Sequence, residues 1–169
     1  MRPRPVPGRQ VTVSLREALR PDDRGAIEEI VRATGFFSHE EVEIAVELVD
    51  DHLEKGLEGG YHFLLAEREG RVVGYACYGQ VPATTASWDL YWIATHPDQQ
   101  GTGLGRVMVD EVADRVRALG GEVLFAETSG RPQYAPTRGF YLRTHFTQAA
   151  LFPDFYAPGD DRVVYALTL

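Results

Sequence analysis

Cysteine is nearly absent from this chain of 169 residues, in which Cys77 is the sole example. One cysteine cannot form an intrachain disulfide, nor can it supply a cysteine-rich metal site. Cys77 falls in the apolar run 72–78, so we expect a small strand residue rather than a nucleophile. The five histidines are scattered, without a pair spaced four residues apart. We therefore expect no bound metal.

The chain also lacks long hydrophobic runs and an excess of basic residues. The first absence predicts no membrane-spanning segment. Residues 1–10 are rich in proline and arginine without an apolar centre, so we expect a flexible tail rather than a secretory signal, and a cytoplasmic protein. The formal net charge of −8 argues against nucleic acid as a partner. This acidic balance suits a cationic partner such as an amine, or simply solubility.

The residues that are present predict one domain over 11–169, long enough to bury a core. Apolar periodicity predicts the order β-α-α-β-β-β-α-β-α-β-β, which implies a mixed α/β sheet with helices on both faces. Ser38 and Glu41 form a capping-box pattern at the start of the second helix. The expected strands cover residues 11–16, 61–67, 71–79, 88–95, 122–128, 146–152 and 163–169, and the expected helices start near Pro21, Ser38, Leu104 and Pro136.

The most informative segment is a glycine-rich turn between a predicted strand and a predicted helix. The strand ends at Thr95, a His96-Pro97 turn follows, and residues 100–106 (QGTGLGR) open the helix. Glycines let a backbone approach a ligand closely, and the first turn of a helix offers unpaired amides and partial positive charge. We therefore expect a phosphorylated cofactor here. The segment lacks both the lysine of a P-loop and the spacing of a dinucleotide fingerprint.

The pattern Q-x-x-G-x-G after a His-Pro turn resembles the pyrophosphate loop of the GNAT superfamily of acetyl-CoA-dependent N-acetyltransferases. The element order over residues 11–169 is also that of the GNAT fold. The resemblance implies a mostly antiparallel sheet of about seven strands and acetyl-CoA as cofactor. It implies that the pyrophosphate is held by Gln100, Gly101, Thr102, Gly103, Leu104, Gly105 and Arg106, and that the backbone of Trp92, Ile93, Ala94 and Thr95 contacts the pantetheine arm.

A second segment, residues 140–146 (FYLRTHF), resembles the family signature F-Y-x-x-x-G-F. The signature tyrosine lies near the cofactor sulfur and acts as general acid, so the resemblance gives that role and a cofactor contact to Tyr141. From the residues alone, an aromatic side chain on an amphipathic helix would be interpreted as core packing. His145 stands where glycine is usual, in a left-handed helix end that histidine adopts at some cost.

Two carboxylates are candidates for the base that deprotonates the amine. Asp89 lies in an apolar and aromatic strand eleven residues before Gln100, an offset at which several GNAT members carry an acidic residue. Burial there would raise its pKa toward a useful range. An equally open interpretation is a carboxylate that pairs with an arginine or caps a neighbouring backbone. Glu127, at the end of the next strand, is the second candidate.

The acceptor side of the site is predicted from three separate segments. The loop containing Phe36 and Phe37 shapes the acceptor groove in this fold, and Tyr134 could line the same cleft from just outside a helix that begins at Pro136. The connection 154–161 often borders the acceptor site, so Asp160 and Asp161 could hold a cationic substrate there. A plain surface turn is at least as compatible with this connection.

These features predict acetyl transfer from acetyl-CoA to the primary amine of a small metabolite. Direct attack is expected because no serine or cysteine triad is recognisable. Two alternatives stay open: acetylation of a protein N-terminus or lysine, and a non-catalytic acyl-CoA-binding or regulatory module with the same fold. A homodimer also stays open, since the apolar run 163–167 could pair across a subunit edge or within one chain.

Overall fold

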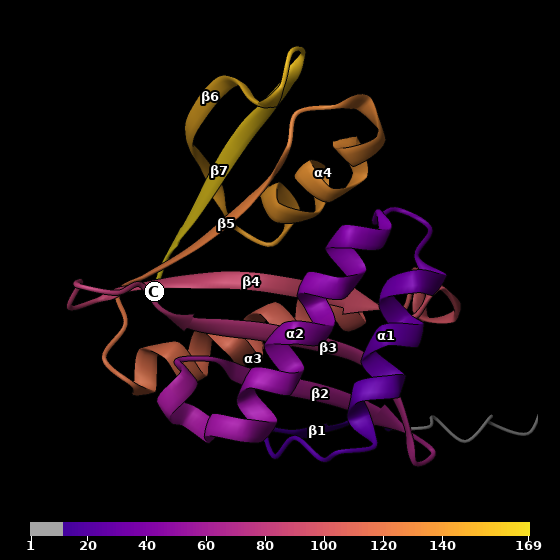
Figure 1. Ribbon diagram of the computed structural model, residues 1–169. Coiled ribbons are helices and arrows are strands. Elements are labelled where there is room, and N and C mark those ends of the chain that lie inside the picture. The colour runs from indigo at the N-terminus through magenta and orange to yellow at the C-terminus, as the bar shows by residue number, and fades with distance from the viewer. Residues whose placement is uncertain (1–11) are drawn as a thin grey trace, which may run out of the picture.

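A seven-stranded sheet with the order β1-β2-β3-β4-β5-β7-β6 runs through the computed structural model, which describes residues 12–169 (Figure 1). Neighbouring strands are antiparallel except for β4 and β5, which are parallel. The predicted mixed, mostly antiparallel fold is confirmed, whereas the predicted tail of residues 1–10 lies outside the described part. The strands are β1 (Ser14–Arg16), β2 (His62–Arg68), β3 (Arg71–Gln80), β4 (Ser87–Thr95), β5 (Val123–Ser129), β6 (Thr147–Ala157) and β7 (Asp160–Thr168).

Four helices cover the two faces of the sheet: α1 (Asp23–Ala33), α2 (His39–Lys55), α3 (Leu104–Ala118) and α4 (Ala135–Arg143). Helices α1 and α2 bury one apolar face each against Phe63, Leu65 and Tyr75. Helix α3 packs against the opposite side of the same strands, where Leu64 and Ala76 point. The side chains of a strand alternate between faces, so the two cores share strands but not residues.

The predicted capping box starts helix α2. The Glu41 amide donates to Ser38 Oγ at 3.2 Å, and the Ser38 amide donates to Glu41 Oε2 at 2.7 Å. These two bonds satisfy amides that have no partner within the helix. They also fix the end of the α1–α2 loop, which carries Phe36 and Phe37.

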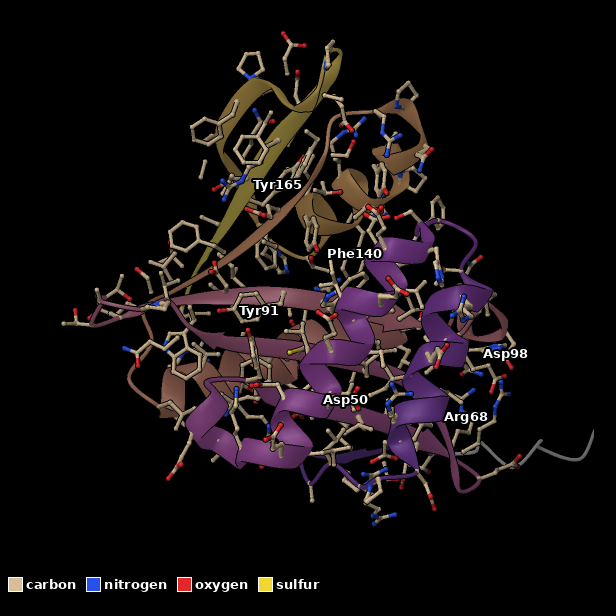
Figure 2. All side chains as sticks on the ribbon, viewed as in Figure 1. Asp50, Arg68, Tyr91, Asp98, Phe140 and Tyr165 are labelled. Carbon is tan, nitrogen blue, oxygen red and sulfur yellow. The ribbon has the colours of Figure 1, made fainter. Side chains whose placement is uncertain are left out.

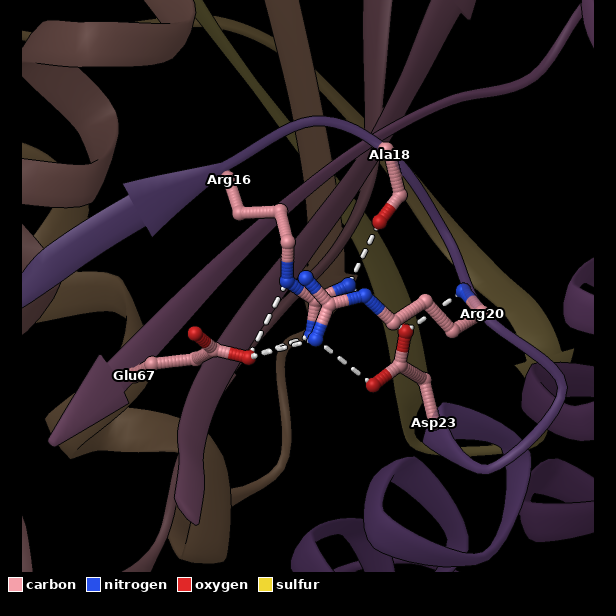
Figure 3. Close-up of polar contacts among 5 residues, drawn as sticks. All are labelled: Arg16, Ala18, Arg20, Asp23 and Glu67. Carbon is pink, nitrogen blue, oxygen red and sulfur yellow. Dashed lines mark hydrogen bonds and ion pairs between the residues drawn. The ribbon is translucent and has the colours of Figure 1, made fainter. Parts of the chain in front are cut away.

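A buried ionic network ties β1 and β2 to the start of α1 (Figure 3). Both terminal nitrogens of Arg16 donate to the carboxylate of Asp23, at 2.8 and 2.9 Å, and its Nε donates to Glu67 Oε1 at 3.0 Å. The Arg20 amide donates to Asp23 Oδ2 at 2.6 Å. Burial would raise the pKa of Asp23, but the hydrogen bonds from Arg16 and Arg20 hold it below its ordinary value.

Strands β4 and β5 separate soon after they pair. Residues 87–89 lie opposite 123–125, and beyond Asp89 the β5 side of β4 has no strand partner in the described chain. On its other side, β4 carries an extra residue, because Leu90 lies opposite Tyr78 and Trp92 lies opposite Cys77. Tyr91 is thus a β-bulge, which bends a strand and increases its twist. The two strands therefore diverge at the level of the bulge (Figure 1).

The last two strands are longer than the sequence predicts. The expected connection over residues 154–161 is wrong in extent, because β6 continues to Ala157 and β7 begins at Asp160, leaving a two-residue turn. Pro153 and Asp154 are residues typical of turns, and the structure has an irregularity here, with φ 54° at Asp154 and a break in register between Phe152 and Ala157, within a span that remains β6. Strand β7 lies between β5 and β6 of the same chain, so residues 163–167 pair internally.

Two features are absent from residues 12–169. No helix there is both long and apolar enough to cross a membrane. Nor do three or more histidine, cysteine, aspartate or glutamate side chains gather in a way that could hold a metal ion.

Candidate active site

A cleft of about 1020 Å³ opens where β4 and β5 diverge. Its walls come from β4, the turn before α3, the end of β5, helix α4 and the α1–α2 loop. Figure 2 labels Tyr91 on β4 and Phe140 on α4, two of the residues that line it. Sixteen of the nineteen predicted site residues line the cleft, namely Phe36, Phe37, Trp92, Ile93, Ala94, Thr95, Gln100, Gly101, Gly103, Leu104, Gly105, Arg106, Glu127, Tyr134, Tyr141 and Asp160. Asp89, Thr102 and Asp161 do not.

The turn that leads into α3, residues 100–106, fits a phosphate group, and we call it the phosphate turn. Gly101 and Gly103 have φ values of 74° and 79°, in the left-handed region that favours glycine, and open space lies where a Cβ would stand. The first hydrogen bond at the helix start runs from the Val107 amide to the Gly103 carbonyl. The amides of residues 104–106 therefore precede the hydrogen bonding of the helix itself. Together with the helix dipole, these amides are suited to bind an anion, and we refer to them as the candidate anion site.

Thr102 is turned away from this anion site. Its hydroxyl donates to the Gln99 carbonyl at 2.6 Å, and its amide donates to the same oxygen at 3.3 Å. These bonds shape the turn from within, which explains why Thr102 belongs to the loop without lining the cleft. Gln99 itself is buried and lines the cleft, although the sequence did not single it out, and its Oε1 has no hydrogen-bond partner among residues 12–169.

The edge of β4 that lines the cleft is backbone without a strand partner in the part of the chain that the structure describes. Residues 92–95 pair with β3 on one side, and β5 has already diverged on the other. An extended ligand arm can therefore add to this edge as an extra strand would, through main-chain groups. The side chain of Trp92 turns to the α1–α2 core, where it packs edge-on against Phe37 with ring centroids 4.6 Å apart.

Tyr141 lies on α4 with only 6% of its surface exposed, yet it lines the cleft. Its ring packs against Tyr165 and Phe146, with centroids 5.5 and 5.2 Å away. Burial, followed by the negative charge of Glu127, raises the pKa of the Tyr141 hydroxyl well above its ordinary value. The hydroxyl is therefore protonated at neutral pH and is available as a hydrogen-bond donor.

The two candidate carboxylates differ in their access to the cleft. Glu127 is half exposed, lines the cleft and forms an ion pair with Arg162. Asp89 is half-buried on the neighbouring strand and does not reach the cleft surface. Burial and the nearby Glu127 carboxylate raise the pKa of Asp89, against a smaller opposing effect of Arg162. The two carboxylates are thus electrostatic neighbours, of which only Glu127 faces the open space.

At the acceptor end of the cleft, the predicted aromatic residues do meet. Phe36 and Tyr134 have ring centroids 6.4 Å apart, and Tyr134 ends a 3₁₀ turn just before α4, as predicted. Asp160 is buried, where it accepts from the Ser129 hydroxyl. Asp161 does not line the cleft, because its Oδ1 accepts from the Asp154 amide at 2.9 Å and so braces the β6–β7 hairpin.

Several residues that line the cleft were not predicted from the sequence. Arg131, Arg143, Glu41 and Tyr156 all line the cleft, although the patterns around them predict only loop, cap or helix surface. The one available signal concerns Arg131, which precedes Pro132 directly after a strand. A residue before proline is held extended, and Arg131 has φ −61° and ψ 150°.

His145, the departure from the family signature, has the left-handed backbone that its position predicts, with φ 73°. Its Nε2 lies 3.1 Å from Nη2 of Arg106, thirty-nine residues earlier in the chain. A neutral imidazole nitrogen can accept the hydrogen bond that a guanidinium donates. The histidine therefore links the end of α4 to the phosphate turn, a contact that glycine could not make.

Known proteins share this architecture. A structure from Desulfovibrio desulfuricans, provisionally named a GNAT-family acetyltransferase, matches with a TM-score of 0.91 and 48% identity over 93% of this chain and 99% of that one. A provisionally named acetyltransferase of Salmonella typhimurium, solved with its cofactor acetyl-CoA, shares the fold at 23% identity and a TM-score of 0.71 over 94% of each chain.

The mycothiol acetyltransferase of Sanguibacter keddieii is 31% identical over 88% of this chain. This chain spans about half, 48%, of the length of that relative. The model of the acetyltransferase (GNAT) family matches residues 23–146, which include the phosphate turn, the unpaired edge of β4 and Tyr141. With this match and the shared fold, the chain belongs to the GNAT family of acetyltransferases.

Proposed function

We propose that this protein transfers an acetyl group from acetyl-CoA to the primary amine of a small metabolite by direct attack. The observation that carries the proposal is the convergence of three features in one cleft. The phosphate turn and the unpaired β4 edge fit the cofactor, and Tyr141 and Glu127 face the same space. The name of the Sanguibacter relative, a mycothiol acetyltransferase, also favours a small-molecule acceptor.

In this mechanism each residue has one task. Bound acetyl-CoA would supply a thioester carbonyl for the amine to attack. Amides 104–106 hold the phosphates, the backbone of residues 92–95 aligns the extended arm, and Glu127 accepts a proton from the incoming ammonium. The raised pKa of Tyr141 keeps its hydroxyl protonated, so it donates a hydrogen bond to the leaving sulfur. Asp89, which lies behind the cleft surface, adds to the negative electrostatic potential at Glu127.

The test is thiol release from acetyl-CoA with a panel of amines, amino acids and short peptides. We expect Tyr141→Phe and Glu127→Gln to lower kcat at least about tenfold, because each removes one proton-handling group. Asp89→Asn should lower it less than about threefold, since Asp89 does not reach the cleft. Arg162→Met is the matched control for Glu127→Gln, because it breaks the same ion pair and leaves the carboxylate in place.

Calorimetry with coenzyme A separates the competing functions. Binding without thiol release from any acceptor would favour the non-catalytic module. Release with peptides but not with small amines would favour the protein acetyltransferase. Absence of coenzyme A binding would contradict the proposal at its base.

A further inference from the structure

The acceptor end of the cleft contains an arginine that is held in place from several directions. Arg131 Nε lies 3.0 Å from Asp160 Oδ2, and its guanidinium carbon lies 5.5 Å from the ring centroid of Tyr134. Its amide donates to Ser129 Oγ at 3.1 Å, and the same hydroxyl donates to Asp160. A side chain fixed in this way pays little further entropy when it binds a ligand.

In these contacts Nε of Arg131 pairs with Asp160, the guanidinium lies over the Tyr134 ring, and the main-chain amide donates to Ser129. Its two terminal nitrogens are left, within the described part of the chain, for another anion. The side chain is 47% exposed and lines the cleft, so a ligand can reach it. Two parallel N–H groups of a guanidinium match the two oxygens of a carboxylate.

A second arginine lies beside Arg131, although the net charge of the chain is −8. Arg138 lies beside it, where Nη1 donates to the carbonyls of Ser129 at 2.8 Å and Arg131 at 2.9 Å. Asp160 is the carboxylate paired with this group. Within residues 12–169, Asp160 is the single carboxylate in an ion pair with either arginine, so one guanidinium charge can still pair with an anionic group on the acceptor.

The proposed base, Glu127, lies on β5 four residues before Arg131 and lines the same cleft. Glu127 and Ser129 share one face of β5, with Cα atoms about 7 Å apart, because side chains alternate and each residue advances the strand by about 3.3 Å. The ammonium and carboxylate of an α-amino acid are separated by one carbon. The cleft therefore offers one partner to each end of such a molecule, because Glu127 and Arg131 both line it. The rings of Phe36 and Tyr134 beside it offer an apolar surface.

We propose that the acceptor is an apolar α-amino acid whose carboxylate is bound by the terminal nitrogens of Arg131 while its amine faces Glu127. This inference rests on the proposed function and names its substrate class. The N–C bond of the product forms as the C–S bond of the thioester breaks. Of the two protons that the ammonium loses, one ends on the coenzyme A thiol and the other in solvent. The products are an N-acetyl amino acid and coenzyme A.

The test compares each amino acid with the amine that lacks its carboxylate. Phenylalanine is paired with 2-phenylethylamine and leucine with 3-methylbutylamine, and phenylalaninamide stands in for a peptide N-terminus. We expect the wild-type kcat/KM to be at least about tenfold higher for the amino acid in each pair. In Arg131→Met this preference should fall to less than about threefold, through loss of activity on the amino acid alone. Arg131→Lys keeps the charge and should retain part of the preference.

Because both substrates are measured on one variant, a general folding defect cannot imitate the expected result. Equal wild-type activity on an amino acid and its amine, or a better rate on the amide, would overturn the inference and leave the proposed acetyltransferase standing. An equal loss on both substrates in Arg131→Met would also overturn it. If no acceptor releases thiol while coenzyme A binds, the proposed function itself fails.

Discussion

At the scale of single residues, His145 combines an unfavourable backbone conformation with a side-chain contact that glycine could not make. A φ of 73° favours glycine, and a residue with a Cβ adopts it at a cost of about 1–2 kcal/mol. In return, the imidazole reaches Arg106 beside the phosphate turn. Glycine at this position would relax the backbone and release the arginine. The residue therefore couples the stability of the α4 end to the geometry of the anion site.

His145→Gly should separate these two effects. We expect the free energy of unfolding in urea to rise by about 0.5–1 kcal/mol, after allowing for the greater freedom of glycine in the unfolded chain. The dissociation constant for coenzyme A in calorimetry should rise severalfold, because Arg106 loses its partner. His145→Asn tolerates the left-handed backbone and should weaken binding with little change in stability. Unchanged affinity in both variants would show that the Arg106 contact has no role in binding.

At the scale of elements, β1, β2 and the start of α1 depend on the network around Arg16 (Figure 3). The pKa of Asp23 is lower in the folded chain than its ordinary value. A carboxylate of this kind stabilises the fold above its unfolded-state pKa, and this stabilisation is lost as the pH falls through the folded pKa. The acid-sensitive window therefore lies below about pH 4.

Asp23→Asn should cost about 1–3 kcal/mol in the free energy of unfolding at pH 7, because it leaves the buried Arg16 with an incomplete set of partners. The difference from wild type should shrink as urea titrations are repeated from pH 5 to pH 3. Asp22→Asn changes the adjacent exposed carboxylate and should cost less than about 0.5 kcal/mol at any pH. A pH-independent difference for Asp23→Asn would mean that its charge is not the cause.

Most elements could be predicted from local patterns because their causes are local. The capping box at Ser38 and the hairpin turn at Glu69-Gly70 each depend on residues within a few positions, and both are observed. The phosphate turn was equally visible, since Gly101 and Gly103 are needed for backbone geometry, whereas Gly105 lies against the Phe140 ring. The extent of β6 was not, because Pro153 and Asp154 favour a turn in isolation, and the strand pairing resumes only at Ala157, which pairs with Asp160 of β7 after an irregular stretch.

The parts of the candidate site that are formed by backbone could be predicted from the sequence. Residues 92–95 of β4 and residues 100–106 of the phosphate turn line the cleft, with Thr102 as the exception. Side-chain direction was harder, because the bulge at Tyr91 and the divergence of β5 depend on tertiary pairing. This explains why Asp89, the first choice of base, lies behind the cleft surface. Arg131 was missed because its position depends on Asp160, distant in sequence.

At the scale of the whole molecule, the cleft separates two parts of one sheet. Residues 87–89 and 123–125 join β4 to β5, and beyond them the walls of the cleft face each other without strand pairing. A ligand in the cleft contacts both parts and stabilises the form that binds it. Cofactor binding should therefore stabilise the parts of the sheet on both sides of the cleft.

Coenzyme A at about one hundred times its dissociation constant should stabilise the fold by about 2.7 kcal/mol, which corresponds to a rise in Tm of roughly 5–10 °C for a chain of this size. Hydrogen exchange should slow on both sides of the cleft, in β4 and the phosphate turn and also in β5 and α4. Scanning calorimetry and exchange mass spectrometry measure the two effects. Protection confined to residues 92–106 would show that the ligand contacts only one wall.

The bulge at Tyr91 also sets the phase of β4. Trp88 and Leu90 point to the α3 core before it, whereas Trp92 and Ala94 point to the α1–α2 core after it. Regular alternation would place all four side chains on the same face. The one extra residue thus reverses which face of the sheet the even-numbered side chains of β4 point to, before and after the bulge. Substitutions along β4 change one core at a time, but a single insertion or deletion between Trp88 and Trp92 would exchange residues between the two cores.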